Sequence, residues 1–314
     1  MSCPSSSAPE AFAGRGGQRA VVEAARRLRA AGRAFALTLV VDTEGSTYRK
    51  PGALALVADD GSQVGVISGG CLEPGLVELA STAIAAGEAR DTTFDTRSDD
   101  DLLFGSGSGC RGRMRVLAVP VLPDAASTIY DTLMGLDETR RPALLAWHEL
   151  AAHLPPGAHV TLQPSPLVLL LGAGPEAPPL LSILRTLGWF AWLADPRPGL
   201  LAARRRDADR VIEDRPAAAL AALGDASPDA VLVMTHAAEH DLAALQSLAA
   251  RDTPYVGLLG PPARRDELLA RLTAAERTAL AGRLHAPVGL PLGGEGPEAI
   301  AIAIAAGLQR AFHQ

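Results

Sequence analysis

The stretch L-V-L-L-L-G-A-G-P-E-A-P-P, residues 167–179, decides how the C-terminal half of this chain folds. An apolar run that ends in a glycine turn, followed by a helical pattern, is typical of a strand leading into a phosphate-binding helix N-terminus. Gly172 and Gly174 would let the backbone approach a pyrophosphate, and Asp195, after the next apolar run, would accept hydrogen bonds from ribose hydroxyls. The stretch therefore predicts a Rossmann-like unit with a dinucleotide-type site.

Three prolines in the same stretch change this prediction. Pro175 suits the first position of a helix, but Pro178 and Pro179 follow within the same turn. Because proline lacks an N–H, we expect the helix to start late and its amides to point differently. Two interpretations stay open: an NAD(P) site built on the two glycines and Asp195, or a Rossmann-like fold kept for structure or for another ligand.

Apolar runs and helical patterns alternate through the rest of this half, which predicts a parallel, doubly wound sheet. The predicted strands are Leu167–Leu171, Phe190–Ala194, Arg210–Ile212, Ala230–Thr235 and Tyr255–Leu259. His236 follows the fourth strand at the edge where such sheets bind ligands, so it would either reach a bound nucleotide or have no role. The same two interpretations apply to His285, in the loop R-L-H-A-P.

In the N-terminal half, apolar strand patterns are joined by short turns, which indicates antiparallel pairing. We expect an α/β protein overall, with an N-terminal α+β domain and a C-terminal Rossmann-like, doubly wound parallel sheet. The predicted divisions are a disordered start over 1–17, a cysteine-loop domain over 18–150, a Pro-rich linker over 151–166 and the Rossmann-like domain over 167–314.

Two cysteines in similar glycine loops are the candidates for chemistry in the N-terminal half. The junction G-V-I-S-G-G-C-L-E-P-G places Cys71 after Gly69 and Gly70, and G-S-G-C ends at Cys110. Amides in such turns can bind an anion, and the start of a helix favours a thiolate. Two thiols in one pocket would suit a soft metal or a sulfur-rich anionic cofactor. The alternatives are a nucleophilic or persulfide-carrying cysteine, and small buried cysteines without chemistry.

The loop E-G-S-T-Y-R-K-P-G, residues 44–52, is a candidate anion site. Ser46 and Arg49, together with Thr47 and Lys50, provide hydroxyl and cationic donors. The alternative is a solvated loop that turns at its Pro-Gly pair.

Composition limits the class of protein. A chain of 314 residues is too long for one ordinary core and predicts two domains. The net charge of −6 argues against a general nucleic-acid binder, and the longest apolar runs have the length of strands, so we expect no membrane span. No basic-then-apolar leader opens the chain, from which we expect a cytoplasmic protein.

Several separated motifs resemble one known family, in order along the chain. They are G-S-T-Y-R-K-P-G-A (Gly45–Ala53), G-V-I-S-G-G-C-L-E (Gly65–Glu73), L-G-A-G (Leu171–Gly174), D-P-R-P (Asp195–Pro198), Y-V-G-L-L-G (Tyr255–Gly260), R-L-H-A-P-V-G-L (Arg283–Leu290) and G-P-E-A-I-A (Gly296–Ala301). On these motifs the chain resembles the xanthine dehydrogenase accessory factor (XdhC/CoxI) family. It departs from the family at Pro175, where a histidine is common, and at Pro261-Pro262, which precede the basic pair Arg264-Arg265.

The resemblance implies a maturation factor that binds the molybdenum cofactor (molybdopterin or its nucleotide form), protects it and delivers it to a xanthine dehydrogenase-type molybdenum hydroxylase. In parts of the family, sulfuration of the cofactor by a cysteine desulfurase is coupled to this delivery. The residues that would contact the cofactor are Cys71 and Cys110 at the molybdenum, Gly69 and Gly70 through their amides, and Ser46 and Arg49 at the pterin phosphate. The Rossmann-like half would bind a nucleotide portion or dock the partner.

We therefore expect a chaperone that delivers a cofactor rather than an enzyme. The first alternative is an NAD(P)-dependent oxidoreductase that uses Gly172, Gly174 and Asp195. The second is a docking scaffold that binds a component of a dehydrogenase but retains neither cofactor nor nucleotide. The sequence also leaves open whether the protein forms a homo-oligomer, because the apolar segment Ala299–Phe312 would suit either an interface or a core.

Overall fold

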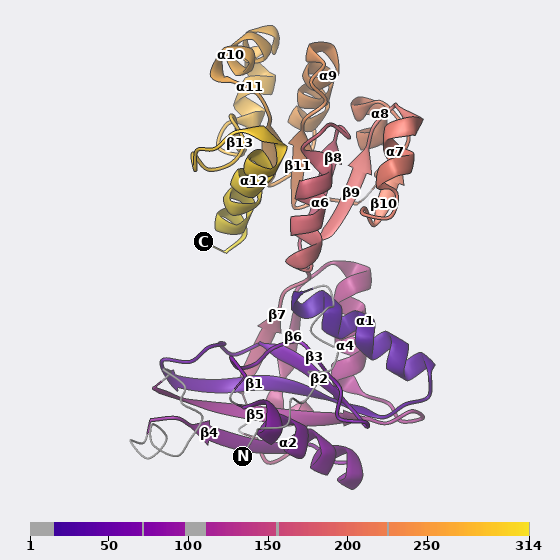
Figure 1. Cartoon of the computed structure of the whole chain (residues 1–314), viewed down its shortest axis with the longest axis vertical. Helices are drawn as coiled ribbons and strands as arrows, with labels where there is room; N and C mark the ends of the chain where they lie inside the picture. The colour runs from indigo at the N-terminus through magenta and orange to yellow at the C-terminus, as the bar shows by residue number, and fades with distance from the viewer. Residues whose placement is uncertain (1–15, 71, 98–110, 155–156, 225, 314) are drawn as a thin grey trace, which may run out of the picture. The chain divides into compact units, whose positions relative to one another are not determined.

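The computed structural model describes residues 16–70, 72–97, 111–154, 157–224 and 226–313 of the chain. The chain divides into two compact units, Met1–Ser165 and Pro166–Gln314 (Figure 1). Each unit combines helices with one main β-sheet, so the α/β class predicted from the sequence is confirmed.

The main sheet of the N-terminal unit has the strand order β3-β2-β1-β5-β4, and all its neighbours are antiparallel. A separate hairpin pairs β6 with β7. In chain order the elements are α1 (Gly17–Ala30), β1 (Phe35–Gly45), β2 (Leu54–Ala58), β3 (Gln63–Val64), α2 (Glu73–Ala86), β4 (Arg90–Asp95), β5 (Gly112–Val121), α4 (Thr128–Thr139), β6 (Ala143–Ala146), α5 (Trp147–Leu150) and β7 (His159–Leu162).

Both faces of this sheet are buried, because successive side chains of a strand point to opposite faces. On β1, Leu37 and Leu39 pack with α1 and α4 on one face. Ala36 and Val40 pack with α2 on the other face. This explains why the first part of β1 reads as a continuous apolar run rather than an alternating pattern.

Two features of this unit differ from the sequence prediction. β1 continues past its predicted end at Val41 to Gly45, since its exposed polar end pairs with the polar start of β5. β7 lies inside the range 151–166, which we predicted to be a linker, and it pairs with β6. The prolines of that range flank the strand in the sequence, so they remove no hydrogen-bond donor from within it.

The sheet of the C-terminal unit is parallel throughout, with the strand order β10-β9-β8-β11-β12-β13. This is the doubly wound order of dinucleotide-binding folds. The elements are β8 (Leu167–Leu171), α6 (Ala177–Thr186), β9 (Phe190–Ala194), α7 (Pro198–Arg204), β10 (Arg210–Ile212), α8 (Pro216–Ala221), β11 (Ala230–Val233), α9 (Ala238–Ala249), β12 (Tyr255–Leu258), α10 (Pro262–Arg271), α11 (Ala274–Leu280), β13 (Leu284–His285) and α12 (Gly296–Phe312).

Helices cover both faces of the parallel sheet (Figure 1). On β8, Val168 and Leu170 pack toward α6, α7 and α12, while Leu169 and Leu171 pack toward the side of α8, α9, α10 and α11. α6 begins only at Ala177, which agrees with the late start that the prolines predict. Within the residues that the structure describes, none of the helices combines the length and apolar character that a membrane crossing needs.

Candidate functional site

Three loops of the N-terminal unit meet at the polar end of β1, and we call residues 45–50, 68–70 and 111–112 the loop cluster. The Ser46 N–H donates to the Arg111 carbonyl at 3.2 Å. A methyl group added at Gly112 would stand 2.4 Å from the Ser46 carbonyl oxygen, so this approach requires glycine. A methyl group at Gly69 would lie 3.9 Å from the Tyr48 ring. The structure thus brings the predicted anion loop and the first cysteine loop together.

The acidic side chains beside the loop cluster already have cationic partners. Arg97 contacts Glu44 at 3.0 Å and Asp95 at 2.6 Å. Arg113 contacts Glu44 at 3.3 Å and Asp42 at 3.5 Å. The hydrogen bonds from Arg97 hold the pKa of Asp95 at about 2, so this carboxylate is charged at neutral pH and balances an arginine.

The remaining cations of the loop cluster have no acidic partner among the described residues. Arg49, Lys50 and Arg111 are exposed, and no acidic side chain in the described part of the chain pairs with them. Lys50 has one weak contact, at 3.4 Å from the Thr47 hydroxyl. Three cations and the exposed Ser46 hydroxyl on converging loops favour a multiply charged oxyanion.

The buried hydroxyl of Ser68 organises the S-G-G-C loop. Its Oγ donates to Glu73 Oε2 at 2.6 Å and accepts the N–H of Gly70 at 3.2 Å and of Leu72 at 3.1 Å. These bonds satisfy donors at the start of α2, where backbone N–H groups lack helical partners. The Gly70 N–H, which we expected to face a ligand together with that of Gly69, is therefore already bonded to Ser68.

Cys71 and Cys110 lie outside the described residues, so their predicted roles as metal contacts stay predictions. Their sequence neighbours Gly70 and Arg111 both belong to the loop cluster. Each cysteine is therefore attached to a segment that the structure places in this cluster.

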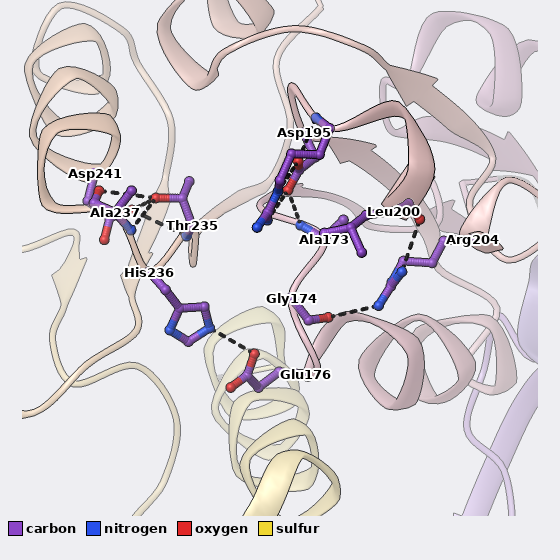
Figure 2. A network of polar contacts seen from close by, with 11 residues as sticks. Ala173, Gly174, Glu176, Asp195, Leu200, Arg204, Thr235, His236, Ala237 and Asp241 are labelled. Atoms are coloured by element: carbon purple, nitrogen blue, oxygen red, sulfur yellow. Dashed lines mark hydrogen bonds and ion pairs between the residues drawn. The ribbon is translucent and has the colours of Figure 1, made fainter. Parts of the chain in front are cut away.

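In the C-terminal unit, Gly172, Gly174, Asp195 and His236 all follow strand ends at the carboxyl edge of the sheet, as predicted. Figure 2 shows Gly174, Asp195 and His236. This edge contains the switch point between β8 and β11, where the strand order reverses. The structure therefore brings the four residues together, although they come from three different strand ends.

Asp195 is turned toward the protein rather than toward a ligand. It is 1% exposed, and its carboxylate accepts the N–H of Ala173 at 2.8 Å and three donors of Arg197 at 2.7–2.9 Å. Burial on its own would raise the pKa of Asp195, but these donors outweigh it and hold the pKa below its ordinary value. A carboxylate offers about four acceptor sites, so four donors leave none for ribose hydroxyls.

His236 and Glu176 form a pair across the switch point. Figure 2 shows the two side chains pointing toward each other, with His236 Nε2 at 3.0 Å from Glu176 Oε2. His236 has a φ of 61°, a left-handed conformation that costs a non-glycine residue free energy. A methyl group at Gly174 would lie 3.1–3.2 Å from both side chains, so the glycine makes room for the pair.

Sequence reasoning missed Glu176, Arg197 and Asp241. Asp241 is fully buried and accepts from Thr235 Oγ1 at 2.6 Å and from Arg264 Nη2 at 2.7 Å. Only the spacing of Arg197, two residues after Asp195, could have signalled its pairing. The Glu176–His236 and Asp241–Arg264 contacts join residues far apart in the sequence and leave no local pattern.

We expect no micromolar binding of NAD or NADP to the switch point. The ribose acceptor Asp195 is saturated, and the Glu176 carboxylate lies where a pyrophosphate would meet the start of α6. Isothermal titration calorimetry with both nucleotides checks this, and the Glu176→Gln variant, which removes the charge, serves as the comparison. A micromolar dissociation constant for the unaltered protein would contradict the expectation.

Comparisons with known proteins agree over both units. A family model described as the XdhC Rossmann domain matches residues 168–308. A second, described as the XdhC and CoxI family, matches residues 28–95. A crystal structure of a xanthine dehydrogenase from Bacillus halodurans has a TM-score of 0.78 and 29% identity, covering 93% of this chain and 96% of that chain.

Two curated relatives extend the comparison. A probable xanthine dehydrogenase subunit of Bacillus subtilis (strain 168) is 30% identical over 86% of this chain and 91% of its own length. An uncharacterized protein of Escherichia coli (strain K12) is 28% identical over 87% of this chain, which corresponds to 42% of that protein. The motifs, the fold and these matches agree, and the chain belongs to the XdhC and CoxI family.

Proposed function

We propose that this protein is an accessory factor for a xanthine dehydrogenase-type molybdenum hydroxylase, which binds the molybdenum cofactor and delivers it to the apoenzyme. Membership of the XdhC and CoxI family and the similarity to the Bacillus subtilis protein support the link to xanthine dehydrogenase. Within this proposal the protein hands over a cofactor and does not turn over a substrate. Sulfuration of the cofactor by a cysteine desulfurase would precede the transfer.

The observation that carries the proposal is the set of cations in the loop cluster that no acidic side chain of the described residues pairs with. Arg49, Lys50 and Arg111 come from loops that contact each other, while the neighbouring acids are occupied by Arg97 and Arg113. A phosphate monoester carries up to two charges and three acceptor oxygens, so this donor set fits the phosphate of a pterin cofactor. Ser46 adds a hydroxyl donor to the same site.

The thiols of Cys71 and Cys110 complete the proposed site. Cys71 follows Gly70 and Cys110 precedes Arg111, so both are attached to the loop cluster. The cofactor supplies a soft metal with sulfur ligands, and thiolates are the protein ligands that suit such a centre. In this arrangement the cations hold the phosphate end, and the cysteines lie at the end that carries molybdenum.

The double substitution Arg49→Gln/Arg111→Gln is expected to lower cofactor loading about tenfold or more, because each charge-assisted hydrogen bond to phosphate contributes about that factor. The full chain is co-expressed with the cofactor biosynthesis proteins, and molybdenum and pterin are measured per purified chain. Arg141→Gln is the matched control, since Arg141 is exposed in the same unit and lies outside the loop cluster. Cys71→Ala, measured in parallel, tests the thiol.

The outcomes separate the parts of the proposal. Loading that falls in the double variant and stays unchanged in Arg141→Gln supports the phosphate site. Equal loading of the double variant and the unaltered chain contradicts that site. An unaltered chain that retains neither pterin nor molybdenum contradicts cofactor binding as a whole and favours the docking-scaffold alternative.

A further inference from the structure

A cavity with polar walls lies in the C-terminal unit, between the strand pair β12–β13 and helix α12. Its volume is about 280 Å³, and its lining includes Tyr255, His285, Gly289, Gly307 and Arg310. Tyr255 is the first residue of β12, whereas the switch point lies beyond the last residues of β8 and β11. The cavity is therefore distinct from the nucleotide edge of the sheet.

Tyr255 and His285 form one wall of the cavity as a stacked pair. Their ring centroids are 3.9 Å apart and their planes differ by 8°. The register of β12 and β13 places His285 opposite Gly257. A methyl group at Gly257 would stand 2.5 Å from Val288 and 2.7 Å from Leu232, so this position beside the stack requires glycine. The stack holds both polar ring ends in fixed positions.

The polar groups of this wall lack protein partners. In the described part of the chain, the Tyr255 hydroxyl, the His285 imidazole and the Arg310 guanidinium make no hydrogen bond or ion pair with another side chain or the backbone. Tyr255 is only 4% exposed, and it lines the cavity. A molecule in the cavity that accepts hydrogen bonds could pair with these groups without displacing a partner from the described residues.

The charges in the cavity favour an anion. Burial raises the pKa of Tyr255 to about 12, against the opposing effect of Arg310, so the hydroxyl keeps its proton. Burial lowers the pKa of His285, and the charge of Arg310 lowers it further, so the neutral imidazole offers one N–H donor at neutral pH. Arg310 alone among these three groups is charged, and all three can donate.

Glycines on both sides keep the cavity open. A methyl group at Gly307 would lie 3.6 Å from the Tyr255 hydroxyl and 3.2 Å from the Gly289 Cα. A methyl group at Gly289 would stand 2.9–3.0 Å from the backbone of α12. Side chains at these positions would fill the cavity or displace its wall next to the Tyr255 hydroxyl.

We propose that this cavity binds a small oxyanion, a phosphate or carboxylate group, held by Arg310 with the Tyr255 hydroxyl and the His285 imidazole. A volume of about 280 Å³ lies just below the usual range for drug-sized ligands, so the occupant is a small molecule or one end of a larger one. The site also gives the R-L-H-A-P motif a role that delivery of the cofactor from the loop cluster leaves unexplained.

Calorimetry on the full chain tests the site, with inorganic phosphate and acetate titrated in separate arms to distinguish the two oxyanions. Arg310→Gln is expected to weaken the binding of the preferred anion about tenfold or more, because it removes a charged donor. Tyr255→Phe keeps the ring stack and the fold, and is expected to weaken binding by several-fold through loss of one hydroxyl donor. Arg205→Gln, at an exposed arginine of the same unit, is expected to change nothing.

All these variants are made in the Arg49→Gln/Arg111→Gln background, which removes the phosphate site proposed for the loop cluster, so the titrations report on the cavity alone. Weakening in Arg310→Gln and Tyr255→Phe but not in Arg205→Gln supports the proposal. Equal affinity in Arg310→Gln and the background chain overturns it, as does the absence of binding for both anions up to about 10 mM. Neither result depends on whether the loop cluster holds a cofactor.

Discussion

Replacing Gly172 by alanine is expected to lower the free energy of unfolding of the C-terminal unit by about 3 kcal/mol or more. Gly172 has a φ of 124°, a conformation that residues with a side chain rarely adopt. The added methyl group would stand 2.4 Å from the Met234 carbonyl oxygen and 2.7 Å from its carbonyl carbon. Steric overlap and backbone strain therefore act at the same position.

The backbone around Gly172 cannot move aside easily. The Gly172 N–H donates to the Ala194 carbonyl at 2.8 Å, and the Met234 N–H donates to the Leu171 carbonyl at 2.9 Å. These bonds join the ends of three neighbouring strands in the middle of the sheet. A shift that relieved the overlap would lengthen bonds on both sides of β8.

Urea unfolding followed by tryptophan fluorescence measures this effect. In a Trp147→Phe background the signal comes only from Trp189 and Trp192, which both lie in the C-terminal unit. Gly199→Ala is the matched control, because no atom lies within 4 Å of the added methyl group. The control should shift stability by less than about 1 kcal/mol. An unchanged urea midpoint for Gly172→Ala would contradict the prediction and show that the strand ends can move enough to accommodate the methyl group.

The second large effect is expected at Asp241, where alanine should cost about 3 kcal/mol. The carboxylate is fully buried and accepts from the Thr235 hydroxyl at 2.6 Å, the Thr235 N–H at 3.3 Å and Arg264 at 2.7 Å. Its removal leaves the Thr235 donors unsatisfied and the mostly buried Arg264 without its counter-charge. Loss of one partner of a buried pair is more destabilising than loss of the whole pair.

Asp266→Ala is the control for Asp241→Ala. Asp266 also pairs with an arginine, Arg265 at 2.7 Å, but its side chain is 64% exposed. An exposed pair contributes about 0–1 kcal/mol, so the control should leave the unfolding midpoint almost unchanged. The same fluorescence assay compares the two variants. An equal decrease in the free energy of unfolding in both variants would mean that burial does not determine how much the Asp241 contacts stabilise the protein.

The parallel sheet was the part of the fold most accessible from the sequence. The predicted bounds of β8, β9 and β10 coincide with those in the structure. Strands buried on both faces consist almost entirely of apolar residues, so their ends stand out against polar loops. The late start of α6 was also predictable, because proline restricts the first turn of a helix through its own covalent geometry.

Two other elements were harder to predict from the sequence pattern. The polar end of β1, Asp42–Gly45, is a strand only because β5 pairs with it, since it is mostly exposed and contains the charged residues Asp42 and Glu44. β7 is short and flanked by prolines in the sequence, so its pairing with β6 could not be inferred from periodicity. In both places the partner strand, and not local preference, determines the structure.

The sequence by itself determined the family, the α/β class and the residues that lie at the ends of the strands. Only the tertiary structure decided which way these residues point and what they contact. It turned Asp195 toward Arg197, paired His236 with Glu176, and joined the loop of Ser46 to that of Arg111. Local periodicity arises from neighbours along the chain, whereas a site is made by groups that packing brings together from distant positions.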